Sequence, residues 1–545
     1  MRVNLDRRRF LATPVLMSPL LAPMIAAAAE GQSASQATRS DAAFRTASEL
    51  EAALTSGDET TLGLVEKALE RIAMIDRAGP TLRSVIEINP EAKAIAEKLD
   101  AERKSQGPRG PWHGIPVLVK DNIATADRME TTAGSLALIG SRPARDAFLI
   151  QRLRAAGAVI LGKTNLSEWA NFRSTRSTSG WSARGGQVKN PYILDRNPSG
   201  SSSGSAVAVA AGLVPAAIGT ETDGSIVSPA SHCGIVGLKP TVGLISRTGM
   251  IPISQTQDTA GPMTRTVRDA ASLLTVLAGP DRNDPATRSA PATAPDYTKV
   301  LDKNGLKGAR IGVLRRYFGF SPLVDSKIEE ALKVLRQQGA ILIDPVGDDD
   351  FCHFGANEIT VMLYEFKAGL NDYLASLGES ARVKSLDELI AFNEVNRDRE
   401  MPFFGQELFH RAQECGPLTD RAYKEALANC RRLSRSEGID RVMDEHKLDA
   451  LVAPTNGPAG VTDLLYSGRG SGGGGCSSPA AVAGYPHITV PAGMIHGLPI
   501  GLSFFGRAWS EPVLLRLAYA YEQATQHFQP PKFLPYLDLG QPAAP

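Results

Sequence analysis

Short apolar runs that alternate with helical patterns are the feature that most constrains how this chain of 545 residues can fold. Each run is bounded by Gly, Pro or polar residues, which is typical of a buried strand. The runs are GIPVLVKDN at 114–122, AGAVILGKT at 156–164, ARIGVLR at 309–315, DALVAPT at 449–455 and PHITVPAG at 486–493. Since helical segments lie between them, the sequence predicts an α/β fold with a mixed β-sheet core that helices cover on both faces.

The segments between these runs predict one domain rather than several. Residues 42–104 have a helical period, and TLGLVEKALERIAMID places Leu62, Val65, Leu69 and Ile72 on one stripe. Residues 324–446 are charged and largely helical, which predicts a helical elaboration on the same sheet. The Pro-rich stretch at 279–295 and the glycine tract SGRGSGGGGCSS at 467–478 are typical of loops. We expect a single domain over residues 42–540.

The charge balance narrows the classes of partner. Lys and Arg number 59 against 58 Asp and Glu, so the formal net charge is +1. A chain this close to neutrality has no long-range field to attract nucleic acid or an anionic membrane, and a neutral or small substrate is expected instead. The five cysteines form no CxxC pair and the eight histidines no HExxH motif. We therefore expect neither a metal nor a cofactor.

The N-terminus has the pattern of a signal peptide over residues 1–29. Basic residues precede an apolar stretch at 11–25, and alanines offer a cleavage site near Ala29. Prolines interrupt the stretch, which is also shorter than the ~20 residues of a membrane span. Arg7 and Arg8, followed shortly by Phe and Leu, resemble the twin-arginine export signal. A periplasmic or secreted location is expected, without stable membrane insertion.

Two familiar motifs match the sequence but not its context. GAVILGKT at 157–164 fits the pattern of a phosphate-binding loop, yet its spacer is apolar and is better explained as the strand itself. GSSSG at 200–204 fits a nucleophile elbow centred on Ser202, with His487 or His496 as a late base. The turn-like RNPSG before it offers no strand to carry such an elbow. Both interpretations are minor alternatives.

A third hypothesis joins Lys120 to the Ser-, Thr- and Gly-rich stretch at 199–241. Lys120 ends the predicted strand at 114–122, where burial disfavours the ammonium ion and lowers the lysine pKa. Such a lysine can be neutral and act as a base. Small hydroxyl residues and glycines let backbone N–H groups converge on one reacting carbonyl. The alternative is a lysine at a strand end that pairs with Asp121.

The stretch GSSSGSAVAVAAGLVPAAIGTETDGSIVSPASHCGIVGLKPT resembles the signature of the amidase signature family. GIPVLVKDN, GAVILGKTNLSEWA, QDTAGPMTRTVRDA, DALVAPT and AGYPHITVPAG resemble further segments of that family in the same order, so that the resemblance covers roughly residues 45–525. It implies the family's fold, a Ser-cisSer-Lys triad, no cofactor, and amide hydrolysis through an acyl-enzyme.

The resemblance implies a role for each matching position. Lys120 would be the triad base, Ser201 the serine on the cis peptide bond, and Ser225 the nucleophile. The oxyanion hole would come from the backbone of Thr222, Asp223, Gly224 and Ser225, with Ser202 and Asp258 as supporting residues. In this scheme Ser225 attacks the amide carbonyl while its proton passes through Ser201 to neutral Lys120.

The sequence departs from the common family pattern beside the nucleophile. Asp223 stands where many members have Gly, and Val227 where many have Arg. The segment GTETDGSIV is similar to the branch that contains peptide amidases, so C-terminal peptide amides are a candidate substrate. An esterase or aryl-acylamidase of the same fold, and a non-catalytic periplasmic binding protein, remain alternatives. The oligomeric state is not predicted.

Overall fold

The computed structural model describes residues 42–291, 295–466 and 473–537. The predicted signal peptide at 1–29 lies outside these residues. By compactness the chain divides into residues 1–45 and residues 46–545, and the second unit contains the central sheet and the helices from α2 (Ala47–Ser56) onward. Among the described residues, no helix is both long and apolar enough to cross a membrane.

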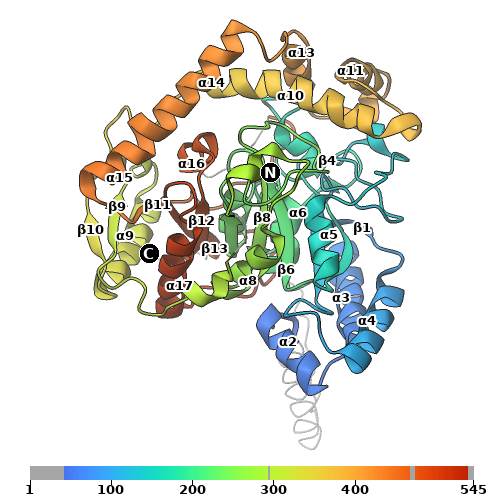
Figure 1. The fold of residues 1–545 in the computed structure, drawn as a ribbon, viewed down its shortest axis with the longest axis horizontal. Coiled ribbons are helices and arrows are strands. Elements are labelled where there is room, and N and C mark those ends of the chain that lie inside the picture. Colours follow the sequence, from blue (N-terminus) through green and yellow to red (C-terminus); the bar gives the residue numbers. More distant parts are fainter. Residues whose placement is uncertain (1–41, 292–294, 467–472, 538–545) are drawn as a thin grey trace, which may run out of the picture. The chain divides into compact units, whose positions relative to one another are not determined.

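A mixed sheet of 11 strands forms the centre of this unit (Figure 1). From one edge to the other the strands are β1 (Val85–Ile88), β3 (Val159–Thr164), β2 (Pro116–Lys120), β6 (Ala216–Glu221), β8 (Thr259–Thr264), β7 (Val236–Lys239), β12 (His487–Ile495), β13 (Leu498–Phe505), β11 (Ala450–Pro454), β9 (Arg310–Val313) and β10 (Ile341–Ile343). Pairing is parallel within β3–β2–β6 and within β11–β9–β10, and antiparallel elsewhere. The predicted mixed sheet is confirmed.

Helices cover both faces of the sheet because side chains alternate along each strand. In β2, Val117 and Val119 join one core and Leu118 joins the other. The first core includes side chains of α2, α5 (Phe148–Ala155), α8 (Val267–Leu277), α9 (Pro322–Gln337) and α17 (Glu511–Thr525). The second includes those of α3 (Thr61–Arg71), α4 (Ala92–Gln106), α6 (Ser203–Ala210) and α7 (Val227–His232).

The five predicted strands are present as β2, β3, β9, β11 and β12, whereas the other six strands of the sheet, β1, β6, β7, β8, β10 and β13, were not predicted. β1 interrupts the N-terminal helical region, and β10 lies within the helical region at 324–446. Apart from α9 and β10, that region contains α10 (Asn357–Ser376), α11 (Leu386–Val395), α12 (Arg397–Glu400), α13 (Glu407–Gln413), α14 (Arg421–Ser434) and α15 (Asp440–His446). A further helix, α16 (Ser478–Ala483), packs in one apolar cluster with α14 and α15.

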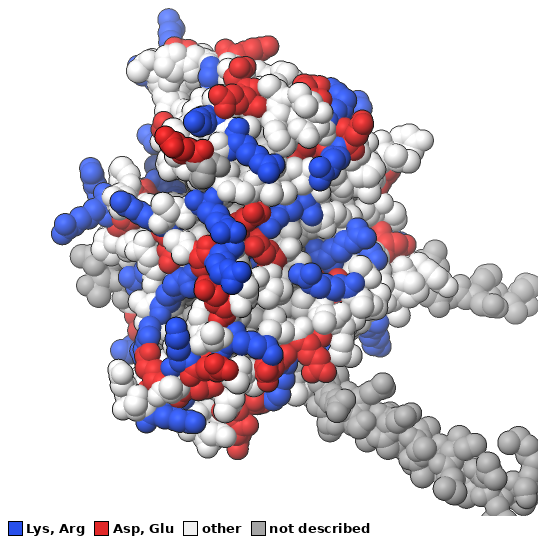
Figure 2. Space-filling view, turned by 90° about the vertical axis from the view of Figure 1, so that its right-hand side faces the viewer, with Lys and Arg blue, Asp and Glu red and all other residues white. Residues whose placement is uncertain are grey.

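Charged side chains of both signs are interspersed over the face of the molecule drawn in Figure 2. This mixing agrees with the nearly balanced count of 59 basic and 58 acidic residues. On that face neither sign gathers into a continuous field of the kind that draws in a polyanion.

Candidate active site

Lys120 is the last residue of β2, and its side chain is fully buried. It shares a side of the sheet with Leu118, two residues earlier, because the side-chain period of a strand is two. Lys120 Nζ donates hydrogen bonds to Ser201 Oγ at 2.7 Å, to Thr220 Oγ1 at 2.9 Å and to the Thr220 carbonyl at 3.2 Å. The hydrogen bonds of Lys120 Nζ within the described part of the chain thus go to Ser201 and Thr220.

Burial lowers the pKa of Lys120 to about 7. Removal from water penalises the charged form, and the negative charges of Asp258 and Glu221 offset only part of that penalty. A substantial fraction of Lys120 is therefore neutral near pH 7, where it can accept a proton. The alternative pairing with Asp121 is not what the structure has, because the Asp121 carboxylate instead accepts hydrogen bonds from Thr132 and Gly134.

The serines at 201 and 202 lie at the start of α6, on a turn that follows a cis peptide bond between Gly200 and Ser201. The Ser202 N–H donates to the Ser225 carbonyl at 3.1 Å. Ser202 Oγ donates to the Thr220 carbonyl at 3.0 Å and accepts from the Thr220 N–H at 3.1 Å. Because these bonds occupy the Ser202 hydroxyl and no strand is found between residues 188 and 202, the nucleophile-elbow alternative is not supported.

Residues 222–225 lie in the loop between β6 and α7. Glu221, the last residue of β6, contacts the backbone just after this loop. Glu221 Oε2 accepts hydrogen bonds from the N–H groups of Ile226 at 2.7 Å and Val227 at 3.0 Å. Within the described part of the chain, the N–H groups of Asp223, Gly224 and Ser225 donate to no other residue. The loop therefore presents consecutive donors that a ligand oxygen can use.

Ser225 is 8% exposed, and its hydroxyl has no hydrogen-bond partner among the described residues. The structure thus joins Lys120 to Ser201, and joins Ser202 to the backbone of Ser225. Within residues 42–291, no hydrogen bond joins the hydroxyl groups of Ser201 and Ser225. The predicted relay has its first link in this structure and lacks its second.

Asp258 connects the loop at 222–225 to a second loop. Its Oδ1 accepts from Thr222 Oγ1 at 2.6 Å, and its Oδ2 accepts from the N–H groups of Ile253 at 2.8 Å and Ser254 at 2.9 Å. Burial raises the pKa of Asp258 to about 6. Near pH 7 the carboxylate is therefore mostly charged, and it is one of the two acidic groups acting on Lys120.

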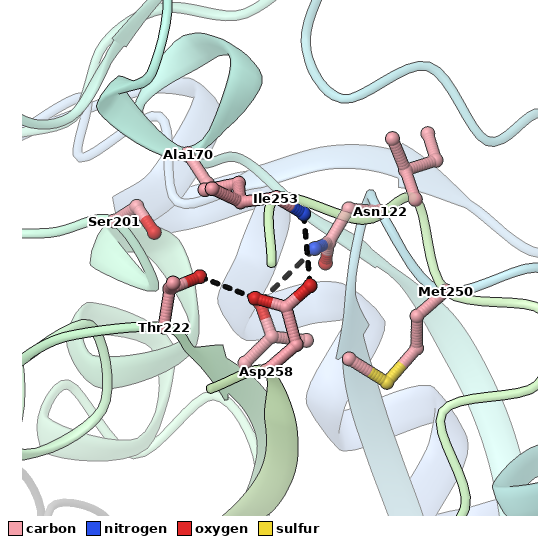
Figure 3. A pocket seen from close by; sticks show the side chains of 9 residues that line it. Asn122, Ala170, Ser201, Thr222, Met250, Ile253 and Asp258 are labelled. Atoms are coloured by element: carbon pink, nitrogen blue, oxygen red, sulfur yellow. Dashed lines mark hydrogen bonds between the residues drawn. The ribbon is translucent and has the colours of Figure 1, made fainter. Parts of the chain in front are cut away.

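A small pocket opens beside these groups. Figure 3 shows Ser201 and Thr222 on one side of the pocket with Ile253 above them, Met250 on the opposite side, and Asp258 between the two sides. Its remaining lining residues are Asn122, Ala170, Thr220 and Ile251. Ser225 is not part of this lining.

Sequence reasoning missed two polar residues of the site. Thr220 Oγ1 accepts from both Lys120 and Asn122, the latter at 3.0 Å. Asn122 Oδ1 is buried without a hydrogen-bond partner in the described structure. Asn122 follows Lys120 by two positions in the KDN segment, which was a usable signal. The sequence could not identify Thr220, because its role depends on a hydrogen bond with Lys120, which is 100 residues away in the chain.

The other motifs are structural. Residues 159–164 of the phosphate-loop match form the fully buried strand β3, as predicted. His487 Nε2 lies 2.6 Å from Ser503 Oγ, which is not a residue of the site. Burial lowers the pKa of His487 to about 3. Within the described ranges, no cluster of three or more His, Cys, Asp or Glu side chains could hold a metal ion.

Comparison with known proteins identifies the family and the fold. The model of the Amidase family matches residues 63–515. A probable amidase of Arabidopsis thaliana is 46% identical over 490 residues, which cover 87% of this chain and 89% of that protein. The crystal structure of native peptide amidase from Stenotrophomonas maltophilia has a TM-score of 0.84 and 53% identity, covering 90% of this chain and 98% of the other.

A second structure of a peptide amidase, in complex with the competitive inhibitor chymostatin, has the same TM-score of 0.84 and 53% identity, and covers 89% of this chain and 98% of that one. A large mixed sheet covered by helices, matched over most of its length by solved peptide amidases, defines a hydrolase of the amidase fold. The chain belongs to the Amidase family and is an amidase that acts on carbon–nitrogen bonds.

Proposed function

We propose that this amidase uses Ser225 as nucleophile, Ser201 as proton relay and Lys120 as base. The observation that carries the proposal is the 2.7 Å hydrogen bond between Lys120 Nζ and Ser201 Oγ, made by a buried lysine whose pKa is lowered to about 7. A base of this pKa suits proton transfer at neutral pH. The adjacent loop offers N–H donors for a developing oxyanion.

The reaction begins when Ser225 Oγ attacks the amide carbonyl carbon. The Ser225 proton moves to Ser201 Oγ as the Ser201 proton moves to Lys120 Nζ, and the carbonyl oxygen becomes an oxyanion. The N–H groups of Asp223, Gly224 and Ser225 donate to that oxyanion. The C–N bond then breaks, and the relay run in reverse delivers a proton to the leaving nitrogen.

Water completes the cycle by attacking the acyl-enzyme at the ester carbonyl. Its proton passes to Lys120 through Ser201, and the acyl–oxygen bond breaks as Ser225 regains a proton. The products are a carboxylic acid and ammonia or an amine. For the Ser201–Ser225 transfer the two hydroxyls must come within hydrogen-bond reach when substrate binds, which is a common adjustment between a free and an occupied site.

The C-terminal carboxamides of peptides are the substrates we propose. The solved peptide amidases, at 53% identity over most of both chains, support this choice, and the segment GTETDGSIV favours the same branch. The partner is then a peptide amide or a small amide molecule. Such a substrate is uncharged at the scissile group and matches the near-neutral charge of the chain.

Mass spectrometry of an N-blocked peptide amide tests the activity and the nucleophile together. The protein should convert CONH₂ to COOH, a gain of about one mass unit, and the Ser225→Ala variant should lose at least ~10³-fold in rate. An unchanged peptide with the intact protein would contradict the substrate assignment and direct the search to aryl amides, small aliphatic amides and esters. An acyl adduct on Ser225 would exclude a purely binding role.

We also propose export through the twin-arginine route. The support is the sequence of residues 1–29, with Arg7-Arg8 ahead of an apolar stretch and alanines. Fractionation of bacterial cells that express the full chain tests it. The protein should appear outside the cytoplasm, and replacement of both arginines by lysine should retain it inside. Equal distribution of the two proteins would contradict the proposal.

A further inference from the structure

The side chain of Asp223 meets a second carboxyl group that the proposed mechanism does not use. Asp223 lies in the loop at 222–225, and Glu358 lies in the first turn of α10, the long helix drawn in yellow in Figure 1. Burial raises the pKa of Glu358, and so do the charge of the neighbouring Asp223 carboxyl and a hydrogen bond between the two carboxyl groups. Two carboxyl groups can form such a bond only if one of them carries a proton.

The surroundings of Asp223 leave room for that proton. Asp223 Oδ2 accepts from Ser478 Oγ at 2.6 Å. Asp223 Oδ1 is buried, and no nitrogen or hydroxyl of the described residues donates to it. An enclosed carboxylate oxygen without a donor is costly, so a protonated Glu358 would supply what this environment lacks.

Glu358 is also tied to the same loop by a second route. Gln257 Nε2 donates to Glu358 Oε1 at 3.0 Å and to the Thr222 carbonyl at 3.4 Å. Glu358 therefore reaches the loop at both Thr222 and Asp223. The contact joins α10 to the loop whose N–H groups are the proposed oxyanion donors.

A second acidic residue of α10 forms hydrogen bonds with the neighbouring loop, which contains Asp258. Glu365 lies seven positions after Glu358 and therefore on the same face of the helix. Its carboxylate accepts from the Thr256 N–H at 3.1 Å and from Tyr423 Oη at 2.7 Å. Glu365 is thus held by neutral donors, whereas Glu358 faces another carboxyl group. The two residues make a matched pair for experiment.

We propose that Glu358 is a positioning residue for the amidase reaction, whose protonated carboxyl holds Asp223 and with it the N–H donors of the oxyanion loop. This inference rests on the proposed role of that loop. When Glu358 loses its proton, two carboxylates face each other and the hydrogen bond is lost. Repulsion between them would displace the loop from the position that stabilises the transition state.

Burial and the charge of Asp223 raise the pKa of Glu358 to about 8, so the loss of its proton falls in an accessible range. Other titratable groups face this pair. The charge of Glu358 affects the pKa of Cys430 in α14. The charge of Asp223 affects the pKa values of Cys476, Tyr317 and Lys239. The two thiols have pKa values raised to about 12 and the pKa of Tyr317 is raised further still, whereas that of Lys239 is lowered to about 8. Among the groups that face this pair, Lys239 is therefore the competing source of a change near pH 8.

The test is the pH profile of kcat/KM for the intact enzyme between about pH 6 and about pH 10. The profile should have an acid limb near pH 7, from Lys120, and an alkaline limb near pH 8, from Glu358. Glu358→Gln keeps a neutral hydrogen-bond donor at every pH. It should retain at least about half of the activity near pH 7 and lose the alkaline limb.

Two further variants separate positioning from a general loss of structure. Glu358→Ala removes the donor, so kcat should fall about tenfold at all pH values while KM changes little, because the oxyanion donors act in the transition state. Glu365→Gln alters the same helix face without touching Asp223, and the alkaline limb should persist in this variant. If Glu358→Gln does not fold, Asp223→Asn removes the like charge and should abolish the same limb.

An alkaline limb that persists in Glu358→Gln or, if that variant does not fold, in Asp223→Asn would overturn the inference and assign the limb to Lys239. The absence of an alkaline limb in the unmutated enzyme would overturn it as well. Failure of the proposed triad gives a different result, since the acid limb would then be missing and Ser225→Ala would stay active. The two hypotheses are thus tested by opposite limbs of one profile.

Discussion

Lys120 Nζ lies 2.7 Å from Ser201 Oγ, although 81 residues separate the two in the chain. Lys120 ends a central strand and Ser201 lies on the turn before α6, so the contact depends on α6 packing against the sheet. The same contact is made by a lysine that burial leaves partly neutral. Substitution or a change of pH can test the Lys120–Ser201 pair, the effect of the Asp258 charge on it, and the packing of α6 that creates it.

Activity should fall as the pH falls through about 7. The pKa of Lys120 is lowered to about 7 by burial, so the base is neutral above this pH and protonated below it. A protonated base cannot accept the relay proton, and kcat/KM should decrease about tenfold per pH unit on the acid side. Initial rates with an uncharged amide substrate measure this limb. A rate that is constant down to about pH 5 would contradict a lysine base.

Lys120→Met should reduce kcat by ~10²–10⁴-fold, because the base is removed while an unbranched side chain still fills the space. Lys163→Met is the matched control. Lys163 is also fully buried at a neighbouring strand, but its Nζ donates to the Ile123 carbonyl and Thr131 Oγ1 instead. This control should alter thermal stability and keep the turnover of the folded fraction. Similar turnover losses in both variants would indicate a structural effect.

Asp258→Asn should move the acid limb to lower pH by about one unit. The negative charge of Asp258 raises the pKa of Lys120 against the effect of burial, so its removal lowers that pKa further. Asp127→Asn serves as the control, since Asp127 pairs with Arg154 and does not act on Lys120. Initial rates measured across the acid limb for both variants and the unmutated enzyme test this prediction. A shift of the Asp258→Asn limb to higher pH would contradict the assigned electrostatics.

Gly204→Ala should destabilise the fold strongly, because α6 packs too closely for a side chain at this position. A Cβ atom at residue 204 would lie 2.2 Å from the Ser84 carbonyl oxygen and 2.4 Å from the Asn165 carbonyl oxygen. Both are backbone atoms that cannot move away cheaply. We expect the melting temperature to fall by several degrees, at a cost of about 2 kcal/mol or more. Gly405→Ala, whose nearest neighbour would be 3.7 Å away, should be nearly neutral.

Much of the fold was predictable because strand signals are local. β2, β3, β9, β11 and β12 each carry an apolar run between turn residues, and such runs need no knowledge of their partners. Of the six strands that were not predicted, β1 and β10 are short, lie at the two edges of the sheet and sit beside helical patterns. Their residues become strands only through pairing with β3 and β9.

The sequence by itself determined the family segments and therefore nominated Lys120, Ser201 and Ser225, since these lie in continuous stretches that a linear pattern can specify. Only the tertiary structure decided which of them touch. It brought Lys120 to Ser201, gave Lys120 and Asn122 a common partner in Thr220, and joined Glu358 to Asp223. The physical reason is that a hydrogen bond and a pKa depend on burial and on neighbours in space, and packing assembles those neighbours from strands and helices far apart in the chain.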